Sequence, residues 1–253
     1  MKKVVKRVLR SVYGLLQRPS LRYSGAFYAA QGAINFFPYE YLTKTVMEFV
    51  AYSNLEGDYL EFGVFEGAHF TAAFHFARMN GLGGMRFYAF DSFEGLPEVS
   101  GVDLEAPRQF SRGQYSCDEG KFRRIVERNG VDMGKVTLIP GWFQDTLTPA
   151  TRRELPLEKA AVIWIDCDFY ESTVPVLKFI GDYVQDGTVL IFDDWFCFNG
   201  NPNYGQQRAF REWLECNPSI TAREFHKYGW AGLSFILNRD ARPAAGAGDT
   251  RAR

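Results

Sequence analysis

Segments with the pattern of a strand alternate along the chain with segments that have the pattern of a helix. Most of the strand segments are short, apolar and rich in β-branched or aromatic residues, which is typical of strands that helices cover on both faces. Strands are predicted at residues 58–62, 86–90, 135–139, 160–165, 188–192, 222–227 and 233–237. Helices are predicted at residues 41–54, 67–80, 117–129, 171–184 and 204–215.

This alternation predicts an α/β fold with an open, mostly parallel sheet and helices on both faces. The last two strands are separated only by the turn sequence Tyr-Gly-Trp-Ala-Gly at residues 228–232, so we expect the last strand to be antiparallel. Ligands of such sheets bind beyond the carboxyl ends of the strands. The residues that directly follow each strand are therefore the first candidates for a functional site.

Three parts of the chain differ in composition. An N-terminal helical, aromatic-rich segment is expected at residues 1–54, an α/β domain at 55–238, and a disordered tail at 239–253. Residues 1–19 combine basic and apolar residues at helical spacing and lack the apolar centre of a secretory signal. We expect this helix to pack on the domain or on a partner subunit, or to contact an anionic membrane surface.

Composition narrows the functional classes. The chain has 253 residues, of which 46% are hydrophobic and 23% charged, which suits one domain with an ordinary core. The formal net charge of -1 argues against a nucleic-acid partner. No apolar run approaches the roughly 20 residues of a membrane span. The four cysteines have no C-x-x-C spacing, so a reducing, cytoplasmic location is expected, with peripheral membrane contact as an addition.

The first strand leads into a turn that contains two glycines. Glu61 precedes Gly63 and Gly67, and the G-x-x-x-G spacing differs from the G-x-G-x-x-G fingerprint of dinucleotide-binding proteins. Glycines let the backbone turn tightly and approach a ligand, and a carboxylate suits a cationic amino-acid group. The alternative is a plain turn between a strand and a helix.

The next two strands also end in candidate ligand-binding residues. Asp91 and Ser92 follow the second strand, where a carboxylate can accept hydrogen bonds from ribose hydroxyls. The alternative for both residues is a helix cap or a turn. Gly141 and Trp142 follow the third strand, where an aromatic ring can stack on adenine or pack in the core.

Acidic residues gather after the fourth and fifth strands. Asp166 and Asp168 follow the former, and Asp193 and Asp194 follow the latter. Like charges at one edge of a sheet repel unless a cation binds or some of them are protonated, and oxygen ligands suit Mg²⁺. The alternative is that they cap helices or are solvated loop acids. The three histidines have no metal-type spacing, and we assign structural roles to His69 and His75.

Several segments together resemble the macrocin O-methyltransferase family of sugar O-methyltransferases. They are YLEFGVFEG at 59–67, FDSFEGLP at 90–97, PGWFQDTL at 140–147, IDCDFYEST at 165–173 and GTVLIFDDW at 187–195. The resemblance implies the fold of a class I methyltransferase, S-adenosylmethionine as the methyl donor and Mg²⁺ as cofactor.

The resemblance also implies a role for each candidate residue. Glu61, Gly63 and Gly67 would line the methionine end of the donor, Asp91 and Ser92 would hold its ribose, Gly141 and Trp142 would border its adenine, and Asp166, Asp193 and Asp194 would hold the metal. Catechol O-methyltransferases place acids at the same strand ends but use a lysine as base. The corresponding stretch here, Cys167-Asp168-Phe169-Tyr170, has no lysine, so we expect Asp166 or Asp168 to accept the proton.

The predicted activity is methyl transfer to a hydroxyl, with a small-molecule or glycan acceptor and a homo-oligomeric enzyme. The segments 27–41 and 99–115 are the expected acceptor-side elements, because aromatic faces suit sugars and long loops often act as lids. A non-sugar diol is an alternative acceptor. A nicotinamide-dependent oxidoreductase and a non-catalytic binding scaffold are alternatives to the methyltransferase.

Overall fold

The computed structural model describes residues 25–239, with side chains from Pro38 onward. The expected helix at 1–19 and all of the expected tail except Arg239 lie outside these residues; Arg239 belongs to the last strand. The chain divides into two compact units, Met1–Tyr41 and Leu42–Arg253. In the first unit, residues 25–41 are helical. Within residues 25–239, no helix has the combination of length and apolar character that crossing a bilayer requires.

A seven-stranded sheet forms the centre of the second unit, with the order β3-β2-β1-β4-β5-β7-β6. The first five strands pair with one another in parallel, and β7 pairs antiparallel with both β5 and β6. The strands are β1 (Asp58–Phe62), β2 (Phe87–Asp91), β3 (Val136–Pro140), β4 (Ala160–Ile165), β5 (Thr188–Phe192), β6 (Ile220–Tyr228) and β7 (Gly232–Arg239). The predicted mostly parallel sheet with an antiparallel last strand is confirmed.

All five predicted helices are present, although the first is much longer than expected. It begins at Gly25 and continues through Pro38. The helices are α2 (Gly25–Tyr52), α3 (Ala68–Met79), α4 (Glu119–Arg128), α7 (Tyr170–Ile180) and α8 (Gly205–Cys216). The sequence pattern did not predict the short helices α5 (Phe143–Thr146) and α6 (Pro149–Glu154) or the 3₁₀ turns η1 (Gly101–Leu104), η2 (Met133–Lys135) and η3 (Phe198–Gly200).

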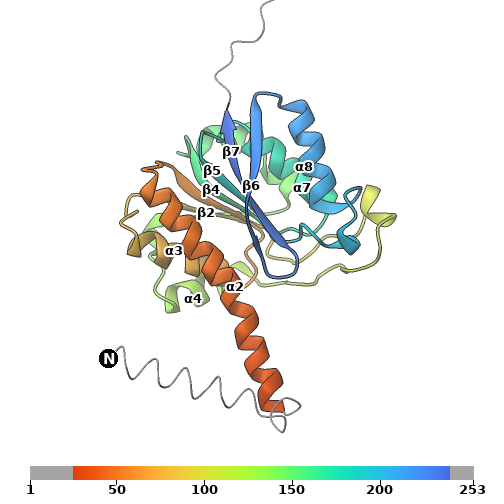
Figure 1. Ribbon diagram of the computed structural model, residues 1–253, viewed down its shortest axis with the longest axis horizontal. Coiled ribbons are helices and arrows are strands. Elements are labelled where there is room, and N and C mark those ends of the chain that lie inside the picture. The colour runs from red at the N-terminus through yellow and green to blue at the C-terminus, as the bar shows by residue number, and fades with distance from the viewer. Residues whose placement is uncertain (1–24, 240–253) are drawn as a thin grey trace, which may run out of the picture. The chain divides into compact units, whose positions relative to one another are not determined.

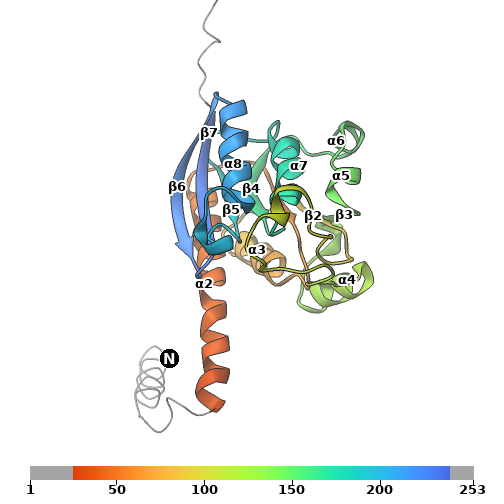
Figure 2. The same ribbon diagram turned by 90° about the vertical axis from the view of Figure 1, so that its right-hand side faces the viewer.

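Helices cover both faces of the sheet (Figures 1 and 2). On one face, Phe62 of β1 packs against Phe143 of α5 and Phe179 of α7. On the other, Tyr59 of the same strand packs against Phe70 of α3. Successive side chains of a strand point to opposite faces, so Tyr59 and Phe62 pack against helices on opposite faces of the sheet.

The ends of three adjacent strands lie side by side. The backbone N–H of Asp166, which follows β4, donates to the carbonyl of Phe62 in β1 at 2.9 Å. The N–H of Asp193, which follows β5, donates to the carbonyl of Ile165 in β4 at 3.0 Å. The turn after β1 and the acidic residues after β4 and β5 therefore share one edge of the sheet, as the strand pattern predicted.

Candidate active site

The glycine turn lies directly against the segment that follows β4. Gly63 has a φ of +87°, and a Cβ at this position would lie 1.8 Å from the carbonyl oxygen of Asp166. Gly67 is the N-cap of α3 and has a φ of +76°, and a Cβ at this position would lie 2.5 Å from Cγ1 of Val126. Both positions require glycine, because the left-handed conformation and the close approach leave no room for a side chain.

Asp91 fixes the conformation of this turn. Its carboxylate accepts hydrogen bonds from the backbone N–H groups of Val64 and Phe93, each at 2.7 Å. Burial raises the pKa of Asp91, and the backbone hydrogen bonds oppose that rise. Ser92 lies in a local turn, where its hydroxyl donates to the carbonyl of Gly95 at 3.1 Å. Ribose binding by Asp91 and Ser92 stays a prediction. Both side chains also stabilise turns, which was the alternative interpretation of these residues.

Gly141 and Trp142 lie next to Asp91. The N–H of Gly141 donates to the carbonyl of Asp91 at 2.9 Å. Trp142 is the residue before the short helix α5, and its side chain is half-buried. The predicted adenine-binding residues therefore adjoin the predicted ribose-binding residues. Adenine binding itself stays a prediction.

Glu61 is buried in the sheet, with 1% of its surface exposed. Its carboxyl accepts a hydrogen bond from the hydroxyl of Tyr59. Burial is the main cause that raises the pKa of Glu61 to about 8, and the nearby histidine at position 69 opposes the rise. Glu61 is thus a buried residue of β1, and its predicted contact with the methyl donor stays a prediction.

The acidic residues form two groups that share Asp166. The ligand atoms of His69, Asp166 and Asp193 lie within 4.8 Å of one another, and so do those of Asp166, Asp168 and Asp194. The predicted set of Asp166, Asp193 and Asp194 is thus split between two neighbouring groups. The sequence did not predict His69 as a member of this site. The site is assembled from a helix and two strand ends that are far apart in the chain, so no spacing between histidines indicates it.

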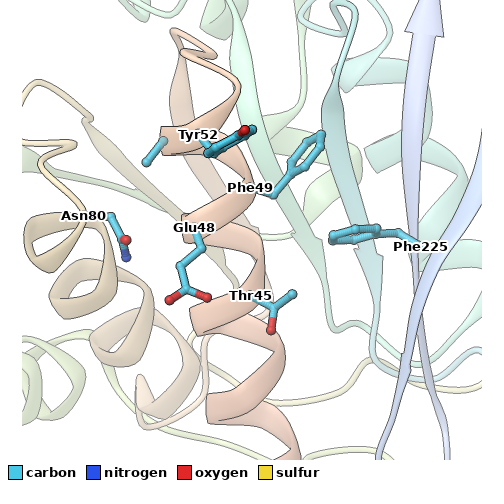
Figure 3. Close-up of a pocket in the computed structure, with 7 residues that line it drawn as sticks. Thr45, Glu48, Phe49, Tyr52, Asn80 and Phe225 are labelled. Atoms are coloured by element: carbon cyan, nitrogen blue, oxygen red, sulfur yellow. The ribbon is translucent and has the colours of Figure 1, made fainter.

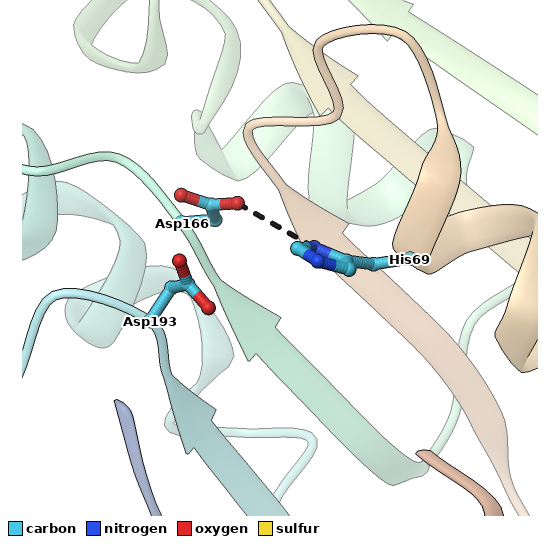
Figure 4. A group of neighbouring side chains, drawn as sticks. All are labelled: His69, Asp166 and Asp193. Atoms are coloured by element: carbon cyan, nitrogen blue, oxygen red, sulfur yellow. Dashed lines mark ion pairs between the residues drawn. The ribbon is translucent and has the colours of Figure 1, made fainter. Parts of the chain in front are cut away.

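In the first group, the side chain of His69 points toward Asp166 (Figure 4). His69 Nδ1 lies 3.7 Å from Asp166 Oδ2, and Asp193 Oδ1 accepts a hydrogen bond from the Tyr228 hydroxyl at 2.9 Å. Burial and the charge of Asp166 raise the pKa of Asp193 to about 7. Burial lowers the pKa of His69, but the surrounding carboxylates outweigh it and raise that pKa to about 9.

The second group is more deeply buried. Asp194 Oδ2 accepts hydrogen bonds from the backbone N–H of Asp168 at 3.1 Å and from Gln206 Nε2 at 3.3 Å. Asp168 has a φ of +60°, which is unusual for a residue other than glycine and turns the chain back at this edge. Burial is the main cause that raises the pKa of Asp168 and of Asp194, and repulsion by the neighbouring carboxylates adds to it.

These donor sets fit a divalent cation. Buried carboxyl groups at one edge repel each other when ionised, and burial makes each charge costly, so a doubly charged ion would stabilise the ionised forms. The group of Asp166, Asp168 and Asp194 offers oxygen ligands alone, which are the ligands that Mg²⁺ prefers.

A loop between residues 96 and 115 packs beside this edge. Asp103 in η1 is buried and accepts hydrogen bonds from the N–H groups of Tyr170 and Glu171 at the start of α7, each at 3.0 Å. Phe110 packs against Phe169, which follows the acidic residues of β4. The expected acceptor-side loop is therefore attached to the chain that carries Asp166 and Asp168. The side chains of the other expected acceptor-side segment are described only from Pro38.

A pocket of about 640 Å³ lies elsewhere on the second unit (Figure 3). Residues of α2, the end of α3 and β6 line it, including Phe49, Tyr52, Asn80 and Phe225. None of the predicted site residues is among its lining residues.

Residues 41–220 match the macrocin-O-methyltransferase (TylF) family. A tetracenomycin rhamnosyl 4'-O-methyltransferase of Streptomyces olivaceus is 33% identical over 160 residues, which cover 62% of this chain and 58% of that protein. Mycinamicin III 3''-O-methyltransferase of Micromonospora griseorubida is 30% identical over 145 residues, which cover 55% of each protein. The chain thus spans less than two thirds of the length of these relatives.

Two solved methyltransferase structures are similar to this one. The O-methyltransferase NovP is 23% identical with a TM-score of 0.66 and coverage of 80% of each chain. The calicheamicin methyltransferase CalS11 is 20% identical with a TM-score of 0.62 and coverage of 93% of each chain. At these identities the likeness establishes the fold alone, and the predicted fold of class I methyltransferases is confirmed.

Proposed function

Since the chain belongs to the macrocin-O-methyltransferase family, we propose that it transfers a methyl group from S-adenosylmethionine to a hydroxyl oxygen of a sugar. One observation carries the proposal. The glycine turn, where the donor would bind, contacts the backbone of Asp166, which belongs to both acidic groups. A donor site and a site that activates a hydroxyl would then lie next to each other, as methyl transfer requires.

The names of the relatives support a sugar as acceptor. One relative is named for methylation of a rhamnosyl tetracenomycin, and the others are named as O-methyltransferases of mycinamicin III and of demethyldecarbamoylnovobiocin. We propose a deoxysugar of a secondary metabolite as the acceptor class, with a surface glycan or a non-sugar diol as alternatives. The enzyme would work in the cytoplasm as a homo-oligomer.

Asp166, Asp193 and Asp194 would hold a divalent cation, for which Mg²⁺ is the proposal. Such an ion, when bound, lowers the pKa of a coordinated hydroxyl and fixes its direction. Asp193 is oriented by Tyr228, and Asp194 by Gln206 and the backbone N–H of Asp168. Because the carboxylates of Asp193 and Asp194 each have hydrogen-bond partners, these two residues can present oxygens in fixed directions.

Asp168 is the proposed base, with Asp166 as the alternative. Its burial and the neighbouring carboxylates raise its pKa above the usual range of an aspartate. A carboxylate with a raised pKa accepts a proton more readily near neutral pH. The hydroxyl oxygen forms a bond to the methyl carbon, the bond from that carbon to sulfur breaks, and S-adenosylhomocysteine leaves with the electron pair. The hydroxyl proton goes to the carboxylate.

Methylation of a panel of glycosides, with and without EDTA, tests the proposal. Asp193→Asn should abolish turnover and leave the calorimetric binding of S-adenosylhomocysteine largely intact. Asp186→Asn is the matched control, because Asp186 is exposed at the opposite end of β5. Binding of NADH instead of S-adenosylhomocysteine would favour an oxidoreductase, and binding of neither would favour a non-catalytic scaffold. Full turnover in Asp193→Asn would overturn the metal role.

A further inference from the structure

We propose that His69, Asp166 and Asp193 form a mixed nitrogen and oxygen site that binds a divalent transition metal more tightly than Mg²⁺. This proposal extends the proposed function, and it rests on one part of it, the binding of a divalent ion at Asp166. It adds a ligand from α3 to a site otherwise built from the ends of β4 and β5, and it changes which ion that site prefers.

The distances suit one ion between the side chains. His69 Nδ1 and Asp166 Oδ2 form an ion pair at 3.7 Å, a distance longer than that of a hydrogen bond. Metal–ligand bonds of about 2.0–2.2 Å allow two ligands of one ion to lie as far as ~4.2 Å apart. Figure 4 shows the side chains of His69, Asp166 and Asp193 converging from the helix and the two strand ends. An ion can therefore contact all three with small adjustments.

The imidazole is held in place by its surroundings. Its ring stacks on the indole of Trp164, with centroids 4.7 Å apart and an angle of 20° between the planes. Trp164 is fully buried in β4, and the side chain of His69 is only 20% exposed. The position of His69 depends on Gly67, whose left-handed conformation begins α3 two residues earlier. A ligand whose direction is fixed before the ion arrives loses little entropy on binding.

Asp193 is also oriented for this group. The Tyr228 hydroxyl contacts Oδ1 of Asp193 at 2.9 Å, and Tyr228 is itself buried. A carboxylate has two oxygens, so this contact fixes the group and leaves a second oxygen to coordinate. Hydrogen bonds from neighbouring residues to ligating carboxylates are a common feature of metal sites.

The ligand chemistry determines the preferred ion. Carboxylate oxygens suit Mg²⁺, Ca²⁺ and Mn²⁺, whereas an imidazole nitrogen favours ions such as Co²⁺, Ni²⁺ and Zn²⁺. The neighbouring group of Asp166, Asp168 and Asp194 contains only oxygen ligands. The proposed Mg²⁺ ligands Asp166 and Asp193 both belong to the His69 group, so binding of a transition metal by this group would compete with Mg²⁺ binding.

Calorimetry of tag-free protein with Co²⁺ and with Mg²⁺ tests the proposal. His69→Phe keeps a ring to stack on Trp164 and removes the nitrogen ligand. Wild-type protein should bind Co²⁺ more tightly than Mg²⁺. The variant should lose at least about tenfold in Co²⁺ affinity, with a changed visible spectrum of bound Co²⁺, and less than about twofold in Mg²⁺ affinity. His75→Phe, on the same helix, should change neither affinity.

The outcomes separate this inference from the proposed function. Binding of Mg²⁺ together with an unchanged Co²⁺ affinity and spectrum in His69→Phe would overturn the role of His69 alone. Failure of wild-type protein to bind either ion would overturn both the metal role in the proposed function and this inference. A spectrum that changes in His69→Phe, while thermal unfolding shows an intact fold, would support coordination by His69.

Discussion

The hydroxyl of Tyr228 lies 2.9 Å from Oδ1 of Asp193 and connects the end of β6 to the acidic edge of the sheet. The same hydroxyl lies 3.0 Å from the carbonyl oxygen of Phe192, the residue before Asp193. Tyr228 thus contacts both the backbone and the side chain at the end of β5. The antiparallel strands at the edge of the sheet thereby contribute to the site, although they carry none of the predicted ligands.

Tyr228→Phe should weaken metal binding more than it weakens the fold. Loss of the hydroxyl frees the Asp193 carboxylate to rotate, so the affinity for a divalent ion should fall by about tenfold in calorimetry. The free energy of unfolding should fall by about 1–3 kcal/mol, because a buried hydrogen-bond partner is removed. Tyr88→Phe is the control, since the Tyr88 hydroxyl is buried with no hydrogen-bond partner among residues 25–239. Equal metal affinity in wild type and Tyr228→Phe would contradict the orienting role.

Gly63→Ala should destabilise the protein and abolish binding of S-adenosylhomocysteine. The added Cβ would lie 1.8 Å from the carbonyl oxygen of Asp166, so the turn must separate from β4. We expect a loss of about 2 kcal/mol or more in denaturant unfolding. Gly83→Ala should be close to neutral, because a Cβ at Gly83 meets no atom within 4 Å. Normal stability and ligand binding in Gly63→Ala would show that the turn tolerates a side chain.

The central strands could be predicted from the sequence with accurate bounds. β4 and β5 have their predicted ends, since each is an apolar run whose residues are all buried. The long start of α2 was missed because the aromatic segment at 27–41 has no amphipathic period and contains Pro38. The short helices α5 and α6 are too brief to show a helical period, although Pro149 after Thr148 is a typical helix start.

The strand-end rule predicted the edge that carries the site but not the grouping of its side chains. Asp193 and Asp194 are consecutive residues in the bend that follows β5, where the alternation of a strand no longer sets the directions of side chains. Asp193 joins His69 and Asp194 joins Asp168, a difference that spacing alone does not reveal. The position of His69 depends on where α3 begins, which the left-handed Gly67 sets.

Asp103→Ala should loosen the loop at 96–115 without unfolding the domain. Asp103 accepts hydrogen bonds from the two N–H groups that begin α7, as a helix cap does, so its loss should cost about 1 kcal/mol. Limited digestion with trypsin should cleave faster at the exposed Arg108 and Arg112. Asp132→Ala removes a comparable cap at η2 and should leave that cleavage unchanged. Unaltered digestion of Asp103→Ala would mean that other contacts hold the loop.

Glu61→Gln should stabilise the metal-free protein at high pH. The pKa of Glu61 is raised by burial from 4.5 to about 8, so the folded protein keeps a proton that the unfolded chain loses. Folding stability therefore falls as pH rises through this window, and Gln removes that dependence while it still accepts the Tyr59 hydrogen bond. The gain in melting temperature over wild type should grow by about 5 °C or more between roughly pH 5 and 9. Exposed Glu98→Gln should show no such trend, and a constant difference in Glu61→Gln would show that the buried carboxyl ionises normally.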